Sequence, residues 1–214
     1  MNDKSQAAHQ PARVFAPFEI FWHWSQSLLI FGLLLTGLEM NGLYTLFRFE
    51  TAFVIHITLA WLLIGLWLMA IFWHITTGEW RNYMPTGKGL LSMAAYYAYG
   101  IFSGESKPYA KTAASKHNPL QRLAYFVFKV AIAPALWVSG LLLLSYNLWR
   151  ESLLGAILPL AVPAAIHVAA ALAIMVFLIV HIYLASTTGN PWYAYLRSMI
   201  TGYSNERSAD EASP

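Results

Sequence analysis

The sequence predicts an all-α membrane protein, an up-and-down bundle of four transmembrane helices. Of its 214 residues, 58% are hydrophobic and only 11% are charged, whereas about 25% of the residues in a typical soluble domain are charged. The apolar residues form four continuous blocks, each longer than the roughly 18 residues that indicate a membrane-spanning helix. These blocks are residues 18–44, 51–75, 120–146 and 163–187.

Each block is long enough to cross a hydrocarbon core about 30 Å thick, since a helix rises about 1.5 Å per residue. Lipid offers the backbone no hydrogen-bond partners, which favours helices, and the blocks are too long and continuous for barrel strands. The first block contains Glu19, Ser25 and Gln26, and no small-residue cleavage site soon follows it. We therefore interpret this block as a retained helix and not as a cleaved signal peptide.

Basic residues indicate how the bundle is oriented. Four spans place both termini on one side, here called side A, together with the long loop 76–117. Side A carries nine basic residues: Lys4, Arg13, Arg81, Lys88, Lys107, Lys111, Lys116, Arg197 and Arg207. The opposite side, side B, carries only Arg48 and Arg150. Because cytoplasmic loops are enriched in Lys and Arg, we expect side A and both termini to be cytoplasmic; nucleic-acid binding is not needed to explain the pI near 9.1.

The segments outside the spans divide the chain into three parts. Residues 1–17 form an N-terminal cytoplasmic tail, residues 18–203 form the bundle domain, and the polar residues 204–214 are expected to be a disordered tail. Within the loop, the short tyrosine-rich apolar stretch 89–102 predicts a helix lying in the membrane interface. The chain has no cysteine, which excludes disulfides, haem attached through C-x-x-C-H and cysteine-ligated iron–sulfur clusters.

Four histidines lie within the spans at matching depths. His167 and His181 are 14 residues apart, close to four helical turns, so they share one helix face about 21 Å apart along the axis. Successive helices run in opposite directions, so His23 is level with His181 near side A, and His56 is level with His167 near side B. Two bis-histidine sites stacked across a membrane are what a di-haem cytochrome b requires, because neutral imidazole is a common haem ligand.

Other interpretations of the polar residues stay open. One intramembrane histidine can simply form a hydrogen bond between helices, but four at paired depths favour ligation. His74 lies 18 residues after His56 and shares its helix face, so it could replace His23, although at the end of a span an interfacial histidine costs little. Lys129 either extends its ammonium group toward side A or pairs with a haem propionate. Two further histidines lie in polar segments and are expected to be solvated: His9 and His117.

Five stretches, in order, resemble a known family. They are FWHWSQSLLIFGLLLTG around His23, VIHITLAWLL around His56, HNPLQRLAYF at the third span, AAIHVAAAL around His167, and HIYLASTTGNPWYAYLRSMITGY from His181 onward. The sequence resembles the cytochrome b subunits of membrane-bound formate dehydrogenase and thiosulfate reductase, most closely the thiosulfate reductase group, over residues 18–203. Lys129 departs from the usually apolar residue of that pattern.

The resemblance implies two haem b groups and a quinone site. His23 and His181 would hold the cytoplasmic-side haem, and His56 and His167 the periplasmic-side haem. A quinone, menaquinone or ubiquinone, would bind beside the cytoplasmic-side haem. The residues implied for this quinone site are Asn118 and Gln121. An amide can donate a hydrogen bond to a quinone carbonyl, but Asn118 followed by Pro119 is also a common helix start.

The implied function is that of a membrane anchor subunit in a respiratory oxidoreductase of the bacterial inner membrane. It would carry electrons between the quinone pool and a periplasmic partner, either iron–sulfur and molybdopterin subunits or a multihaem cytochrome c. The thiosulfate type implies quinol oxidation, and the formate dehydrogenase or hydrogenase type implies quinone reduction; both directions stay open. A stand-alone cytochrome b561-like superoxide:quinone oxidoreductase would need a basic periplasmic entry, where side B offers two arginines. A haem-free carrier or structural protein is a third alternative.

Overall fold

The computed structural model describes residues 12–100, 102–105, 108, 118–187, 189 and 191–204. Most of the predicted N-terminal tail, the C-terminal tail beyond Ser204, and the side A residues Lys4, His9, Lys107, Lys111, Lys116, His117 and Arg207 lie outside the described residues.

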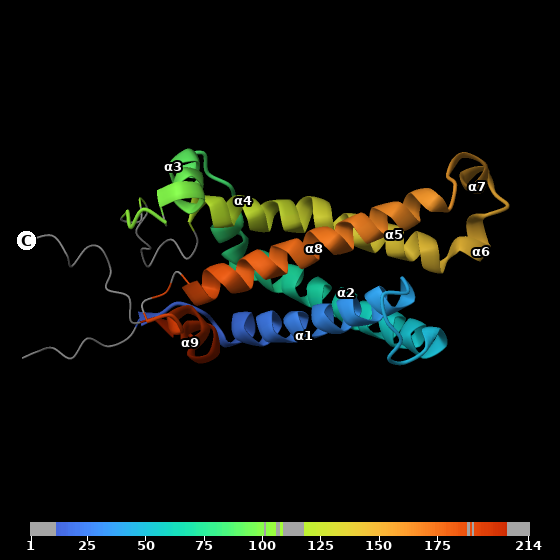
Figure 1. Ribbon diagram of the computed structural model, residues 1–214, viewed down its shortest axis with the longest axis horizontal. Helices are drawn as coiled ribbons and strands as arrows, with labels where there is room; N and C mark the ends of the chain where they lie inside the picture. The colour runs from blue at the N-terminus through green and yellow to red at the C-terminus, as the bar shows by residue number, and fades with distance from the viewer. Residues whose placement is uncertain are drawn as a thin grey trace, which may run out of the picture.

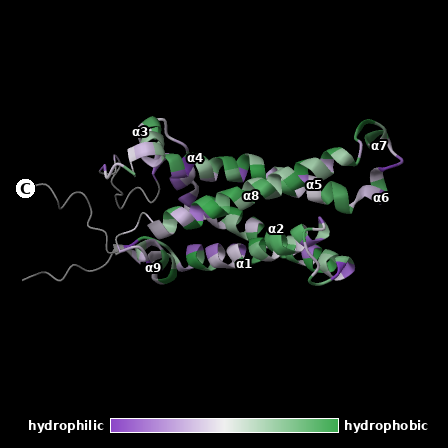
Figure 2. Ribbon diagram, in the orientation of Figure 1, coloured by the Kyte–Doolittle hydropathy of each residue, from purple (hydrophilic) through white to green (hydrophobic). Residues whose placement is uncertain are grey.

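Four long helical spans run side by side along the molecule (Figure 1). They are α1 (Pro17–Met40), α2 (Phe49–Thr77), a third span over Pro119–Leu144, and α8 (Ala161–Thr187). Each is long and apolar enough to cross a membrane. Figure 2 shows hydrophobic colour along the helices and hydrophilic colour mostly at their ends and in the connecting loops. The predicted all-helical bundle of four candidate spans is therefore confirmed.

The first span ends four residues earlier than expected because a local turn and a buried acid close it. The N–H of Gly42, whose φ is +80°, donates to the carbonyl of Glu39 over 2.8 Å. The buried Glu39 carboxylate then accepts the backbone N–H groups of Leu46 and Phe47 at 2.8 and 2.7 Å. These bonds fold the chain back into α2, so the loop residues up to Tyr44 are outside the helix.

The third span contains a break that the sequence analysis did not predict. It consists of α4 (Pro119–Val127), a π-helical turn η3 (Phe128–Ile132) and α5 (Ala133–Leu144). The N–H of Ala133 donates to the carbonyl of Phe128, five residues back. Pro134 follows at once, and its ring has no N–H and clashes with the preceding turn of an α-helix. The wider π turn accommodates it within the span.

The spans pack as two hairpins, α1 against α2 and α5 against α8. The buried core between them contains Leu63, Trp67 and Ala133. Trp67 stacks on Trp137 with ring centroids 5.2 Å apart, and its Nε1–H donates to Gln26 over 3.1 Å. On α1 the residues packed against this core lie between His23 and Thr36; they are Leu29, Ile30 and Leu33. The core therefore separates the two ends of the bundle.

Short elements cover the two ends of the bundle (Figure 1). One end carries α6 (Tyr146–Trp149) and α7 (Leu153–Ile157). The other carries the loop elements η1 (Glu79–Tyr83), α3 (Leu90–Ala95) and the π turn η2 (Tyr96–Gly100), so a short helix lies in the stretch predicted to be helical.

The chain segments that flank the bundle meet at the same end. Strand β1 (Ala12–Arg13) pairs antiparallel with β2 (Tyr203–Ser204), and α9 (Ala194–Thr201) precedes β2. The Nε1–H of Trp24 on α1 donates to the carbonyl of Met199 on α9 over 2.9 Å. Both termini therefore leave the bundle from one end, as four spans require.

Candidate functional site

The four intramembrane histidines form two pairs, each bridging two helices. The rings of His23 on α1 and His181 on α8 have centroids 6.1 Å apart. The rings of His56 on α2 and His167 on α8 have centroids 6.3 Å apart. His167 and His181 lie 14 residues apart in one continuous helix, so the two pairs are about 21 Å apart along α8. These are the two pairings expected from helix direction and depth.

The spacing within each pair suits one metal ion between two imidazoles. A bond from imidazole nitrogen to a metal such as zinc is about 2 Å long, so centroids 6.1 and 6.3 Å apart leave room for one ion. Within the described part of the chain, no cluster of three or more His, Cys, Asp or Glu side chains could hold a metal. Each pair therefore offers two imidazole nitrogens, and a metal ion held there would need further ligands from a bound group.

A hydroxyl from the neighbouring helix holds the ring of His56. The Oγ1 of Thr36 on α1 lies 2.9 Å from Nδ1 of His56. The same hydroxyl lies 2.8 Å from the carbonyl of Gly32, which can only accept a hydrogen bond. Both contacts are hydrogen bonds together when the hydroxyl donates to the carbonyl and Nδ1–H donates to the hydroxyl, and this arrangement leaves Nε2 with the lone pair that a metal requires.

The same arrangement is repeated at His167. The Oγ of Ser139 on α5 lies 3.1 Å from Nδ1 of His167 and donates to the carbonyl of Ala135 at 2.5 Å. Thr36 and Ser139 are among the most buried polar side chains of the described residues. Sequence analysis missed both of them. Each is a hydroxyl directly before glycine inside a long apolar helix, a pattern that singles the residue out but does not indicate which histidine it contacts.

The glycine after each hydroxyl makes room for the imidazole. A Cβ added at Gly37 would lie 3.4 Å from Cε1 of His56, and one at Gly140 would lie 3.0 Å from Cε1 of His167. The distance at Gly140 is shorter than an ordinary van der Waals contact and the distance at Gly37 is at its lower limit, so a methyl group would press on the His167 ring more than on the His56 ring. The Thr36–Gly37 and Ser139–Gly140 dipeptides therefore cradle the two rings of this pair, and these residues fit an axially ligated cofactor.

The pair near the other end has different surroundings. Nδ1 of His23 is buried and has no hydrogen-bond partner among the described residues. His181 stacks on Phe177 of its own helix, with centroids 5.7 Å apart and planes 16° apart. This pair is therefore held by packing, whereas the pair of His56 and His167 is held by hydroxyls.

His74 lies near this end but outside both histidine pairs. Its ring packs edge-on against Trp22 and Tyr83, each with centroids 5.2 Å away. Its Nδ1 lies 2.6 Å from the carbonyl of Ala70, one turn back in α2. The structure places His23, and not His74, against His181.

Lys129 lies on aromatic rings at the end of the bundle where α9 lies. Its Nζ is 3.3 Å from the ring centre of Tyr83 and 5.7 Å from that of Trp22, an arrangement in which the ring faces attract a cation. Burial, and then the carboxylate of Glu19, raise the pKa of Tyr83 above its usual value. The phenol of Tyr83 therefore stays neutral. The Lys129 ammonium extends toward the side A loop, which is the first of the two arrangements that the sequence left open for it.

Asn118 and Gln121 form the start of α4. Asn118 Oδ1 accepts the Gln121 N–H at 2.8 Å, and Gln121 Oε1 accepts the Asn118 N–H at 3.1 Å, a reciprocal capping box. The Asn118 side-chain amide also donates to the hydroxyl of Tyr97 over 3.2 Å. Asn118 therefore caps the start of α4, as one of its two interpretations predicted, and its side chain is buried.

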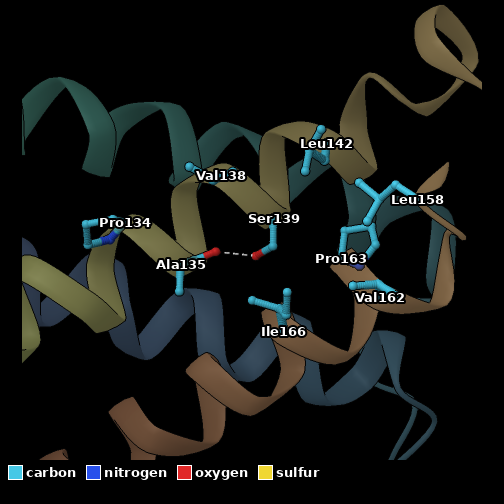
Figure 3. Close-up of a pocket in the computed structure, with 9 residues that line it drawn as sticks. All are labelled: Pro134, Ala135, Val138, Ser139, Leu142, Leu158, Val162, Pro163 and Ile166. Atoms are coloured by element: carbon cyan, nitrogen blue, oxygen red, sulfur yellow. Dashed lines mark hydrogen bonds between the residues drawn. The ribbon is translucent and has the colours of Figure 1, made fainter. Parts of the chain in front are cut away.

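An apolar cavity of about 360 Å³ lies between α5 and the start of α8, at the other end of the third span from Asn118 (Figure 3). Ser139 contributes the hydroxyl that is visible in its wall. The lining residues are Pro134, Ala135, Val138, Ser139, Leu142, Leu158, Val162, Pro163 and Ile166.

Two comparisons with known proteins relate the chain to cytochromes. A family model described as prokaryotic cytochrome b561 matches residues 14–202, which include all four spans. The chain is 30% identical over 187 residues to "Putative cytochrome YdhU" of Escherichia coli (strain K12), an alignment that covers 85% of this chain and 70% of that protein. No solved structure matches the chain significantly.

Proposed function

The chain belongs to the prokaryotic cytochrome b561 family, and we propose that it carries electrons across the bacterial inner membrane by means of two haem b groups. Membership makes it a multi-pass, haem-binding membrane cytochrome that transfers electrons across the bilayer. The number of haems, their ligands, the quinone and the partner are parts of the proposal.

The two histidine pairs carry this proposal. His23 and His181 would hold one haem b near side A, and His56 and His167 would hold the other near side B. Ring separations of 6.1 and 6.3 Å, both involving one face of α8, support this assignment. When bound, a haem iron accepts and releases single electrons. The protein would supply the histidine nitrogens that hold each haem, the orientation of these rings, and an apolar layer around Leu63 and Trp67 between the two sites.

A quinone site near the head of α4 is the second part of the proposal. Asn118 and Gln121 lie at the side A end, where a quinone headgroup could receive a hydrogen bond from an amide or from the Tyr97 hydroxyl. The excess of basic residues on side A supports a cytoplasmic position for this end, so quinone chemistry here would exchange protons with the cytoplasm. Because both amides also form the helix cap, the quinone would share these groups with the backbone.

The third part of the proposal is that the chain is the membrane anchor of a respiratory oxidoreductase. The resemblance to thiosulfate reductase and formate dehydrogenase cytochrome subunits supports a periplasmic partner that carries iron–sulfur and molybdopterin centres, or a multihaem cytochrome c. The partner would approach side B, the end of the bundle that carries α6 and α7 (Figure 1).

Purification from membranes tests these parts separately. We expect the detergent-solubilised protein to contain two haem b per chain, by pyridine haemochrome assay and by a reduced-minus-oxidised spectrum. One haem or none per chain would contradict the ligand assignment. Co-purification of a periplasmic redox subunit supports the anchor role, whereas a chain that stays alone and rapidly consumes superoxide contradicts it.

A further inference from the structure

We propose that Thr36 and Ser139 are positioning residues that fix the proton of His56 and His167 on Nδ1. We also propose that they make His56 and His167 stronger electron donors to a bound haem iron than His23 and His181. The proposal rests on the proposed function, because it assumes that each histidine pair ligates a haem.

The contacts of each ring determine which nitrogen carries the proton. At His56 the Thr36 oxygen lies 2.9 Å from Nδ1, and at His167 the Ser139 oxygen lies 3.1 Å from Nδ1. Each hydroxyl oxygen also lies within hydrogen-bond distance of a carbonyl of its own helix, Gly32 for Thr36 and Ala135 for Ser139. Because a carbonyl only accepts, both contacts of each hydroxyl are satisfied when the hydroxyl donates to the carbonyl and accepts from Nδ1–H. We infer this arrangement, in which both rings present an unprotonated Nε2.

A hydrogen bond from the far ring nitrogen also changes the strength of the ligand. When Nδ1–H donates to an acceptor, electron density on the ring rises and the ligand becomes more basic. A more basic axial ligand stabilises the oxidised, more positive iron and lowers its reduction potential. Both members of the pair of His56 and His167 have such acceptors.

The other pair lacks this support. Nδ1 of His23 has no hydrogen-bond partner in the part of the chain that the structure describes, and the His181 ring stacks on the face of Phe177 of its own helix. We therefore expect the haem at His56 and His167 to have the lower reduction potential and the haem at His23 and His181 the higher one.

The test compares substitutions that delete one oxygen with substitutions that keep it. Thr36→Val and Ser139→Ala remove the hydroxyl with little change in volume, and Thr36→Ser and Ser139→Thr retain it. The control is Thr58→Val, because the Thr58 hydroxyl on the same helix as His56 donates only to the carbonyl of Val54. Each protein is purified with its haems, and both midpoint potentials are measured by optical redox titration.

We expect Thr36→Val and Ser139→Ala to raise the potential of the lower-potential haem and to leave the other unchanged. Thr36→Ser, Ser139→Thr and Thr58→Val should behave like the unchanged protein. The electron paramagnetic resonance signal of the oxidised haem should shift in the same two variants. In the His23→Ala background, which keeps only the haem of His56 and His167, the same rise should be seen in the single remaining titration.

Three results are decisive. Two haems with unchanged potentials in both hydroxyl deletions overturn the proposal. If Thr36→Val loses a haem, the test rests on Ser139→Ala alone. An unchanged midpoint potential of the lower-potential haem in Ser139→Ala then overturns the proposal. A wild-type protein without two haems instead overturns the proposed function, before any hydroxyl is changed.

Discussion

The rings of His56 and His167, from two helices of different hairpins, face each other with centroids 6.3 Å apart, and each is bonded at Nδ1 to a hydroxyl of its own hairpin partner. Thr36 belongs to α1, which packs on α2, and Ser139 belongs to α5, which packs on α8. Each hairpin therefore orients one histidine, and docking of the two hairpins brings the histidines together. The site depends on both halves of the bundle.

Removing either histidine of this pair should remove one cofactor and spare the other. We expect His56→Ala and His167→Ala to reduce the haem content from two per chain to one, because an iron with a single axial ligand binds weakly. The absorption band of the remaining haem should be unchanged, since the two sites are about 21 Å apart along α8. A pyridine haemochrome assay checks the content, and two haems with normal spectra would show that the pairing is wrong.

The two glycines beside these rings should differ in their tolerance of a methyl group. An added Cβ would lie 3.0 Å from His167 at position 140 and 3.4 Å from His56 at position 37. Overpacking typically costs about 1–3 kcal/mol, so we expect Gly140→Ala to weaken haem retention about 10-fold and Gly37→Ala to weaken it less. Haem loss to apomyoglobin measures both. Equal retention in the two variants would contradict this ranking.

The sequence was sufficient for the spans and for the levels of the histidines, because lipid imposes length and hydropathy and because helix direction alternates. Three features could not be predicted in this way. The early end of α1 depends on Glu39 capturing two backbone N–H groups, and the π turn before Pro134 depends on how one helix relieves a local clash. The hydroxyls on His56 and His167 depend on the rotation of neighbouring helices about their axes, which spacing along one helix does not determine.

The buried carboxylate of Glu39 should stabilise the loop between α1 and α2. Its Oε1 accepts the N–H groups of both Leu46 and Phe47, and a buried N–H left without its acceptor costs about 1–3 kcal/mol. We expect Glu39→Ala to lower the midpoint of thermal unfolding in detergent, and Glu39→Gln, which keeps an oxygen acceptor, to lower it less. Differential scanning fluorimetry measures both. A Glu39→Gln protein as unstable as Glu39→Ala would show that the negative charge, and not the acceptor geometry, holds the loop.

Asn118 has two roles that one pair of substitutions can separate. It caps α4 through Oδ1, and we propose that its amide also serves a quinone. Asn118→Ser keeps a good N-cap but lacks the amide, whereas Asn118→Ala loses both and should cost about 1 kcal/mol of helix stability. We expect both variants to retain two haems and to reduce quinol-dependent haem reduction, measured by stopped-flow absorbance, several-fold. If Asn118→Ser reacts at the normal rate while Asn118→Ala is slow, the residue acts only as a cap, since restoring the cap alone would then have restored the reaction.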